Sequence, residues 1–388
     1  MGMFLLCTFL MIILYPLGID LYLVAVPRIA QTLQGSEAQI HTAFSIYLLG
    51  MAATVLPGGM LADRHGRRPV VLGGALIFVV ASLVAAEATG IAQFYLGRFW
   101  QGVGAGALYI MTFTVLRDVL SQARLAMALS LINGVICVIP VLAPVLGYLI
   151  LSHFEWRGIF VGMALVAAIS ALVNLRLLKE TRPARPSAGA SPLALLGTAP
   201  FMLRALLTSA SVTAILVYVS VSPLVLMTTF GLSPEQYTRL MMAMAGVSMS
   251  ASFLTPLLLR WLGKARVLAL SHLAYLLALL ALLCSSGPEG GLSWLLAGCA
   301  LVCIGFSCGF GVAMGEALDV CGDQVASASA LLCIMQIGLS GLFIWGMGHL
   351  GMPALWMLIL ALLLALLGYL VVKVLLPWRA IRRVRARG

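Results

Sequence analysis

Two side chains of opposite charge stand inside long apolar stretches of this sequence. Asp20 lies seven residues before Pro27, and Arg98 lies seven residues after Ile91. Seven helical residues span about 10 Å, so both charges are expected about 10 Å below the same membrane face. A charge at that depth costs at least about 2.5–3.5 kcal/mol unless it is paired or hydrated, and such groups usually mark a substrate or proton path.

The chemistry expected at this depth is the binding and release of a proton. Asp20 is predicted to be the main protonation site, with Arg98 at matched depth in an antiparallel span where the two side chains could face each other. The alternative is a fixed ion pair that only orients two helices.

The composition places these charges in a membrane. Of the 388 residues, 62% are hydrophobic and 9% are charged, whereas a soluble protein has about 25% charged residues. The chain has room for about twelve spans of about 20 residues. The eight cysteines form no CxxC pair and no Cys/His set, so neither a metal site nor a disulfide framework is predicted, and no cofactor is expected.

The apolar runs predict an all-α integral membrane protein with two six-helix bundles, at residues 1–178 and 201–376. Residues 179–200 are rich in Pro, Ala and Ser and are expected to form a linker, and residues 377–388 form a basic tail. The expected spans are 3–26, 38–62, 70–86, 91–116, 125–151, 158–178, 201–230, 236–260, 266–285, 291–318, 325–350 and 353–376.

The Lys and Arg residues set the expected orientation. Of the 23 such residues, all except Arg28, Arg157, Arg239 and the intramembrane Arg98 fall on one side of the predicted topology. Short loops rich in Lys and Arg stay in the cytoplasm, so both termini are predicted to be cytoplasmic. The net charge of +11 therefore reflects membrane orientation, and no nucleic-acid partner is expected.

The two halves echo each other weakly. Pro27 and Pro223 are 196 residues apart, and Gly66 and Gly263, in two basic loops, are 197 apart. Repeated six-span halves are typical of transporters, with a site near the midplane between them.

Three motifs resemble those of the major facilitator superfamily. The loop sequence Gly59-Met-Leu-Ala-Asp63-Arg64-His-Gly66-Arg67-Arg68 resembles the signature between its second and third spans. Arg98-Phe-Trp-Gln101-Gly102 resembles its fourth-span motif, in which the arginine is implicated in proton coupling. Ala143-Pro144-Val-Leu-Gly147 is similar to the fifth-span antiporter motif in degenerate form.

Further residues resemble the twelve-span drug/proton antiporters within that superfamily, namely Asp20 with Pro27, Trp156-Arg157 and Lys179-Glu180-Thr181. The resemblance implies the major facilitator fold and a monomer in the bacterial inner membrane. It also implies proton-driven export of lipophilic drugs such as chloramphenicol by alternating access.

The resemblance assigns roles to three groups of residues. The proton-coupling and substrate cavity comprises Asp20, Arg98, Gln101 and Tyr22, and the antiporter motif comprises Gly134, Pro140, Pro144 and Gly147. The conformational latch comprises Gly59, Asp63, Arg64, Gly66, Arg67, Arg68 and Arg117. In that latch Asp63 is expected to pair with Arg117 and the start of the eleventh span; the alternative is a solvated loop that only sets orientation.

Two other classes of function compete with drug export. A major facilitator carrier for a metabolite or sugar would need several hydrogen-bonding side chains, whereas methionines such as Met241, Met242 and Met244 favour an adaptable apolar surface. A membrane enzyme is disfavoured because the sequence has no HExxH motif, paired catalytic carboxylates or Ser/His/Asp arrangement at one depth.

Overall fold

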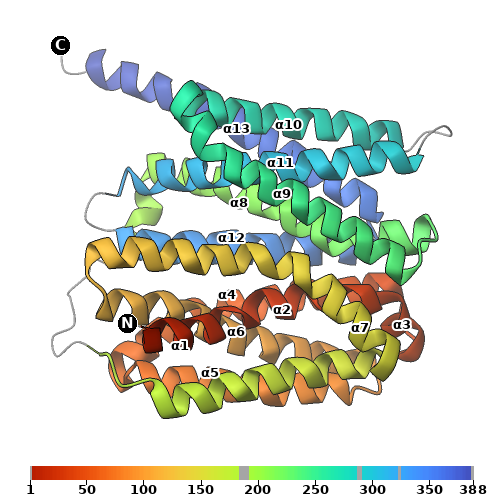
Figure 1. The fold of residues 1–388 in the computed structure, drawn as a ribbon. Coiled ribbons are helices and arrows are strands. Elements are labelled where there is room, and N and C mark those ends of the chain that lie inside the picture. The colour runs from red at the N-terminus through yellow and green to blue at the C-terminus, as the bar shows by residue number, and fades with distance from the viewer. Residues whose placement is uncertain (1, 183–191, 286–290, 322–324, 386–388) are drawn as a thin grey trace. The chain divides into compact units, whose positions relative to one another are not determined.

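The computed structural model describes residues 2–182, 192–285, 291–321 and 325–385, and long helices make up most of these ranges (Figure 1). Long helices suit a membrane because each satisfies its backbone hydrogen bonds internally. They are α4 (Glu37–His65), α5 (Arg67–Ala86), α6 (Ile91–Val119), α7 (Gln122–Leu177), α8 (Ala199–Pro223), α9 (Pro234–Leu262), α10 (Lys264–Ser285), α11 (Gly291–Leu318), α12 (Val325–His349) and α13 (Ala354–Arg385).

Eleven segments of the described chain are long and apolar enough to cross a membrane. One of them belongs to α7, whose 56 residues contain a non-helical residue, Glu155, with φ 60° and ψ −177°. The Ile150 side chain lies 3.6 Å from the Cβ position of Gly162, although twelve residues of straight helix would separate them by about 18 Å. The chain therefore reverses at Glu155, and dividing α7 there gives the expected twelve helical crossings.

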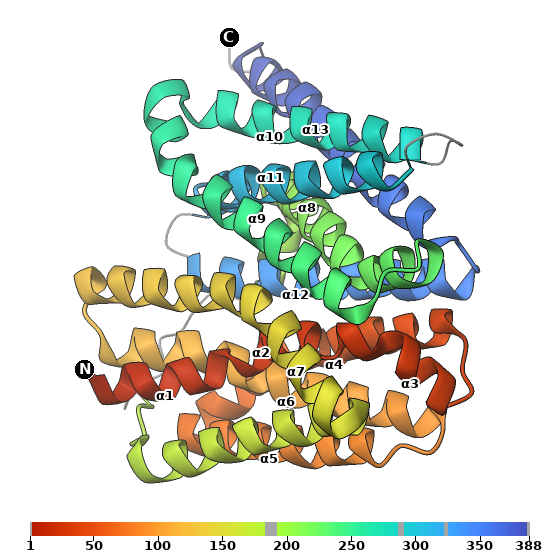
Figure 2. The same cartoon turned by 45° about the vertical axis from the view of Figure 1, so that its right-hand side comes forward.

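The second arm of α7 runs antiparallel along α5, as Figure 2 also shows. Arg157 donates a hydrogen bond to the Ala88 carbonyl just beyond the end of α5, at 3.1 Å. At the other end of α5, Arg68 donates to the Leu175 carbonyl. This pairing fixes the position of α5 and of the charged loop that precedes it.

The first span, expected over residues 3–26, is not one regular helix. Its pieces are α1 (Gly2–Ile12), α2 (Leu14–Asp20), the 3₁₀ segment η1 (Leu23–Ala25) and α3 (Val26–Thr32). Irregular backbone at membrane depth needs other partners, and side chains supply them. The carbonyls of Leu10, Tyr15 and Gly18 accept hydrogen bonds from Ser170, Tyr47 and Arg98, at 3.0, 3.0 and 2.8 Å.

The local structure repeats at the spacing that the sequence suggested. Ser36 begins α4 with a capping box shared with Gln39, and Ser233 and Gln236 exchange the same two hydrogen bonds at the start of α9, at 2.9 and 3.2 Å. Both helices end at glycines with positive φ, 103° at Gly66 and 79° at Gly263. Each matching pair is 197 residues apart, which supports an internal repeat.

The chain forms two compact units, and three of their boundaries fall inside helices, in α8, α9 and α12. One unit comprises Met1–Ala188, Ser222–Ala243 and Gly341–Gly351, and the other comprises Gly189–Val221, Met244–Ser340 and Met352–Gly388. The six-helix halves stay a prediction. Residues 183–191 of the expected linker lie outside the described residues, and the rest of it includes the 3₁₀ segment η2 (Pro192–Gly197). A π-helix, η3 (Leu224–Thr229), follows Pro223.

Helices α4 and α6 approach each other backbone to backbone. A Cβ atom on Gly102 would lie 2.1 Å from the Tyr47 carbonyl oxygen, and one on Gly50 would lie 2.2 Å from that of Phe99. Small residues allow such contact between membrane helices. This close approach brings Tyr47 of α4 beside Arg98 of α6.

We expect Gly102→Ala to destabilise the protein, because the added methyl group meets the backbone of α4 rather than a flexible side chain. Overpacking of this kind typically costs about 1–3 kcal/mol. Gly73→Ala is the matched control, since Gly73 in α5 has no atom within 4 Å of its Cβ position. Thermal unfolding in detergent should show a lower midpoint for Gly102→Ala only; equal midpoints for the two variants would contradict the close approach.

Candidate functional site

Arg98 is fully buried, seven residues after the start of α6 at Ile91. One Nη atom donates to the Gly18 carbonyl at 2.8 Å, and the other donates to the Gln101 side chain. The guanidinium carbon lies 4.4 Å from the centroid of the Tyr22 ring and 4.5 Å from that of Tyr47. The charge is therefore surrounded by neutral acceptors and aromatic rings.

Gln101 connects Arg98 to the neighbouring helix. It is fully buried, and its amide donates to the Ser82 hydroxyl of α5 at 2.8 Å. Ser82 donates in turn to the Phe78 carbonyl at 2.7 Å. This chain of hydrogen bonds fixes the orientation of the Gln101 amide, so that its oxygen faces Arg98.

Asp20 is the last residue of α2 and is buried, with 7% of its surface exposed. Among the described residues, no ion pair within 4.0 Å joins Asp20 to Arg98. The structure nevertheless brings them to one region, because Gly18, two residues before Asp20, binds Arg98. Tyr22 lies in the break of the first span between α2 and η1, and its ring contacts the Arg98 guanidinium. All four predicted cavity residues thus lie near the break.

Arg67 organises the charged loop, defined here as residues 59–72. Its Nε donates to Asp118 and one Nη donates to Asp63, each at 2.8 Å. The Arg67 and Asp118 side chains are buried, whereas 64% of the Asp63 side chain is exposed. The buried pair ties the loop to the end of α6.

Glu180, just beyond α7, closes the same loop from the other side. Its carboxylate accepts hydrogen bonds from the backbone N–H groups of Arg67 and Arg182 at 2.8 and 2.9 Å, and of Thr181 and Arg68 at 3.0 and 3.2 Å. Burial raises the pKa of the Glu180 carboxyl, but these donors outweigh it and hold the pKa below its ordinary value.

Gly66 is required beneath that carboxylate. Its φ is 103°, and a Cβ atom there would lie 2.4 Å from a Glu180 carboxylate oxygen. A free helix N-terminus binds anions through unpaired N–H groups and its positive end. Glu180 occupies that place at the start of α5.

The structure does not contain the predicted pair of Asp63 with Arg117, which stays a prediction for the outward-open state. Asp63 pairs with Arg67, four residues later along the chain, and within the described ranges no ion pair joins Asp63 to Arg117. The reason is geometric: the buried Arg67 guanidinium lies between Asp63 and Asp118. Of the other latch residues, Arg64 offers its backbone carbonyl to Arg182 at 2.8 Å, and Gly59 has no atom within 4 Å of its Cβ position.

The antiporter-motif residues lie in the first arm of α7. Pro140 and Pro144 are inside the helix, and the Pro144 carbonyl lies 3.5 Å from the Thr238 hydroxyl. A Cβ atom on Gly147 would lie 2.3 Å from the Leu21 carbonyl oxygen, so α7 passes directly over the break in the first span. Gly134 lies nearer the start of this arm.

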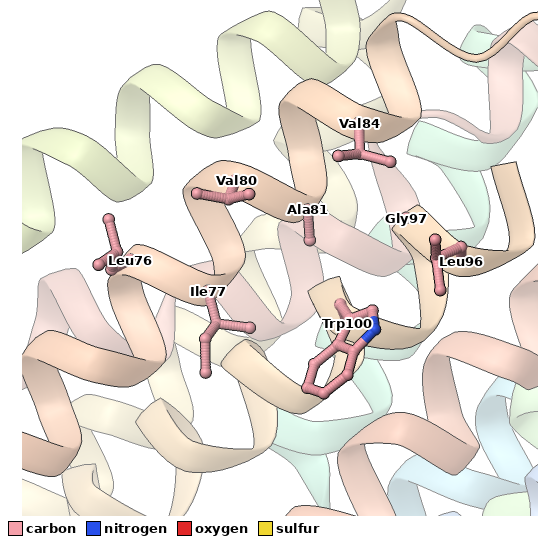
Figure 3. A pocket seen from close by; sticks show the side chains of 8 residues that line it. All are labelled: Leu76, Ile77, Val80, Ala81, Val84, Leu96, Gly97 and Trp100. Atoms are coloured by element: carbon pink, nitrogen blue, oxygen red, sulfur yellow. The ribbon is translucent and has the colours of Figure 1, made fainter. Parts of the chain in front are cut away.

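Two cavities are lined by other residues. One, of about 400 Å³, is a wholly apolar hollow between α5 and α6, and Figure 3 shows its lining: Leu76, Ile77, Val80, Ala81, Val84, Leu96, Gly97 and Trp100. The other, of about 350 Å³, is partly polar and is lined by Arg28, Tyr148, Leu151, Ser152, Ser233, Pro234 and Glu235. Neither contains a residue predicted for proton coupling.

Sequence reasoning missed four residues of these networks: Tyr47, Ser82, Asp118 and Glu180. Asp118 was adjacent to the predicted Arg117 and is the acid at the same helix end. Glu180 belongs to the Lys179-Glu180-Thr181 motif, which resembles the drug/proton antiporters, but that resemblance assigned no structural role to Glu180. Tyr47 and Ser82 gave no signal, because single polar atoms in apolar runs are common.

Comparison with protein-family models matches residues 8–332 to the Major Facilitator Superfamily. The multidrug resistance protein MdtL of Klebsiella pneumoniae (strain 342) is 46% identical to this chain over 365 residues, which cover 92% of each. MdtL of Escherichia coli O81 (strain ED1a) is 44% identical over 369 residues, covering 94% of this chain and 93% of the relative.

Solved structures of transporters share the fold at much lower identity. A D-xylose–proton symporter matches with a TM-score of 0.75 and 14% identity, covering 96% of this chain and 97% of its own. The nucleoside transporter NupG matches with a TM-score of 0.74 and 15% identity, covering 96% and 98%. Fold, motifs and relatives agree, and this multi-pass membrane protein belongs to the major facilitator superfamily, whose members are transporters and not enzymes.

Proposed function

We propose that this chain is a proton-coupled multidrug exporter that moves lipophilic compounds such as chloramphenicol by alternating access. The observation that carries the proposal is 46% identity to a multidrug resistance protein over 92% of both chains. The environment of Arg98 supports it, since a buried charge in a membrane helix usually lies on a substrate or proton path.

In this proposal Asp20 binds and releases the proton, and Arg98 supplies a fixed positive charge beside it. Because Arg98 is held by carbonyl, amide and aromatic groups, its position does not depend on an ion pair with Asp20. Gln101 orients Arg98, and Tyr22 joins the guanidinium to the segment that carries Asp20. Asp20 is thus left available for exchange with proton and cargo.

The charged loop acts as the conformational latch on the cytoplasmic side. The Arg67–Asp118 pair and the Glu180 cap hold the ends of α5, α6 and α7 together. This arrangement lets the first six spans, from α1 to the end of α7, move as one body while the rest of the chain rearranges. Asp63 adds a weaker, exposed contact to the same arginine.

A carrier for a defined metabolite or sugar is the second candidate. The sugar and nucleoside transporters found by structure are 14% and 15% identical, which supports the fold and not the cargo. Export of a defined sugar or metabolite, with no response to lipophilic drugs, would favour this candidate.

The proposed setting is the bacterial inner membrane, with the protein acting as a monomer and both termini in the cytoplasm. The excess of Lys and Arg in loops on one side, including the five arginines after Pro377, supports this orientation.

We expect cells that lack their main efflux pumps to accumulate less chloramphenicol when they express this protein, and a protonophore should abolish the difference. Asp20→Asn should abolish it as well, because an amide cannot exchange a proton. Unchanged accumulation across a broad drug panel would contradict export. Full protonophore-sensitive export by Asp20→Asn, at matched protein levels, would exclude Asp20 as the main protonation site.

The proposed latch predicts unequal effects for Asp118 and Asp63, the two acids that bind Arg67. Asp118→Asn leaves Arg67 buried without its buried partner, and breaking such a pair typically costs about 3–5 kcal/mol. Asp63→Asn removes an exposed partner, which is typically worth about 0–1 kcal/mol. Chloramphenicol uptake by inside-out vesicles should therefore fall at least about tenfold for Asp118→Asn and less than about twofold for Asp63→Asn. Equal losses would refute the ranking.

The Glu180 cap predicts a pH-dependent difference in stability. Because its pKa lies below the ordinary value, the ionised carboxylate stabilises the fold above the ordinary pKa, and this contribution is lost as the pH falls through the folded-state pKa. Glu180→Gln should lower the melting midpoint by a few degrees at pH 7, with a shrinking difference below about pH 4.3. Glu235→Gln, at an exposed carboxylate, is the control; a difference for Glu180→Gln that is independent of pH would contradict the cap.

A further inference from the structure

We infer that Tyr47 is a positioning residue of the transport cycle, whose ring holds the Arg98 cation in place beside Asp20. The inference rests on the proposed function. No motif of the sequence points to Tyr47, and it lies in the middle of α4, on a different helix from both charges.

The Tyr47 ring is one of two that confine the guanidinium. Its centroid lies 4.5 Å from the Arg98 guanidinium carbon, nearly the distance of the Tyr22 ring, whereas Phe160 is farther away at 6.0 Å. A cation is attracted to the negative face of an aromatic ring, and the attraction strengthens when the cation is desolvated. Arg98 is fully buried, so this contact acts under the conditions in which it is strongest.

The Tyr47 hydroxyl fixes that ring to the interrupted first span. It donates to the Tyr15 carbonyl at 3.0 Å, and it would lie 2.5 Å from a Cβ atom on Gly18. The ring therefore fills the space over Gly18, whose carbonyl binds Arg98. The Tyr47 side chain therefore contacts both the Arg98 guanidinium and the segment whose Gly18 carbonyl accepts a hydrogen bond from Arg98.

This placement has a functional consequence because no acid neutralises Arg98 within 4.0 Å among the described residues. An arginine in an ion pair would be aimed by its partner, and it would change position when that partner took up a proton. Aromatic faces do not titrate in this way. Tyr47 thus keeps Arg98 in place while Asp20 exchanges its proton.

The test is a fluorination series at position 47, in which Phe and mono-, di- and trifluorophenylalanine replace Tyr47 by genetic code expansion. The shape of the ring changes little along the series while its negative face weakens. Chloramphenicol uptake into proteoliposomes driven by an imposed proton gradient should fall stepwise, by about tenfold from Phe to the trifluoro variant. Gel filtration and thermal unfolding of each variant check that the fold is retained.

Tyr95→Leu is the control, because the Tyr95 hydroxyl, like that of Tyr47, joins two helices: it donates from α6 to the Gln39 carbonyl of α4 at 2.8 Å. No contact of Tyr95 with Arg98 is among those of the described residues. It should keep uptake near the wild-type rate. A flat fluorination series, with wild-type transport intact, would overturn the role of Tyr47 alone. Absence of proton-driven chloramphenicol uptake by the wild type would overturn the proposed function and this inference together.

Discussion

A buried arginine that must stay charged inside a membrane helix is the constraint on which the N-terminal helices depend. Insertion of such a group costs about 2.5–3.5 kcal/mol or more, and a guanidinium does not neutralise itself by losing a proton. The protein offsets this cost with the Gly18 carbonyl, the Gln101 side chain and two tyrosine rings. Each of these partners needs a specific backbone position, so Arg98 dictates how α2, α4 and α6 meet.

The break in the first span follows from the same constraint. A regular helix uses each carbonyl within its own turn, and residues near an interruption can offer theirs to other helices. Gly18 and Tyr15 do so, to Arg98 and Tyr47. Asp20 lies at the end of α2, directly before the interruption. The segment that carries the candidate proton site is therefore positioned by the cation rather than paired with it.

A second arginine organises the charged loop by a different means. Arg67 is also buried, but it has a buried acid, Asp118, at 2.8 Å, and its backbone N–H is capped by Glu180. An ion pair suits a structural junction between helices, because both charges are satisfied together. The contrast supports the separation of roles: Arg67 holds helices together, whereas Arg98 leaves its neighbouring acid available for exchange.

Much of the architecture followed from the sequence because its signals are local or periodic. The long apolar runs, the turn between the expected spans 125–151 and 158–178, and the 197-residue spacing of Gly66 and Gly263 in two basic loops are all properties of short segments. The partners within residue pairs were harder to predict from the sequence. Asp63 was assigned to Arg117, and the structure joins it to Arg67. Tyr47 and Glu180 were missed because their partners lie on other helices, 51 and 113 residues away in the sequence.

In the proposed transport cycle, cargo and proton compete at the Asp20 carboxylate, which lies near the separately anchored Arg98. Proton release on cargo binding tests it most directly. Purified wild-type protein in weakly buffered detergent solution should release protons when chloramphenicol is added, and more drug should bind as the pH is raised. Saturable chloramphenicol binding with no proton release at any pH would contradict the account.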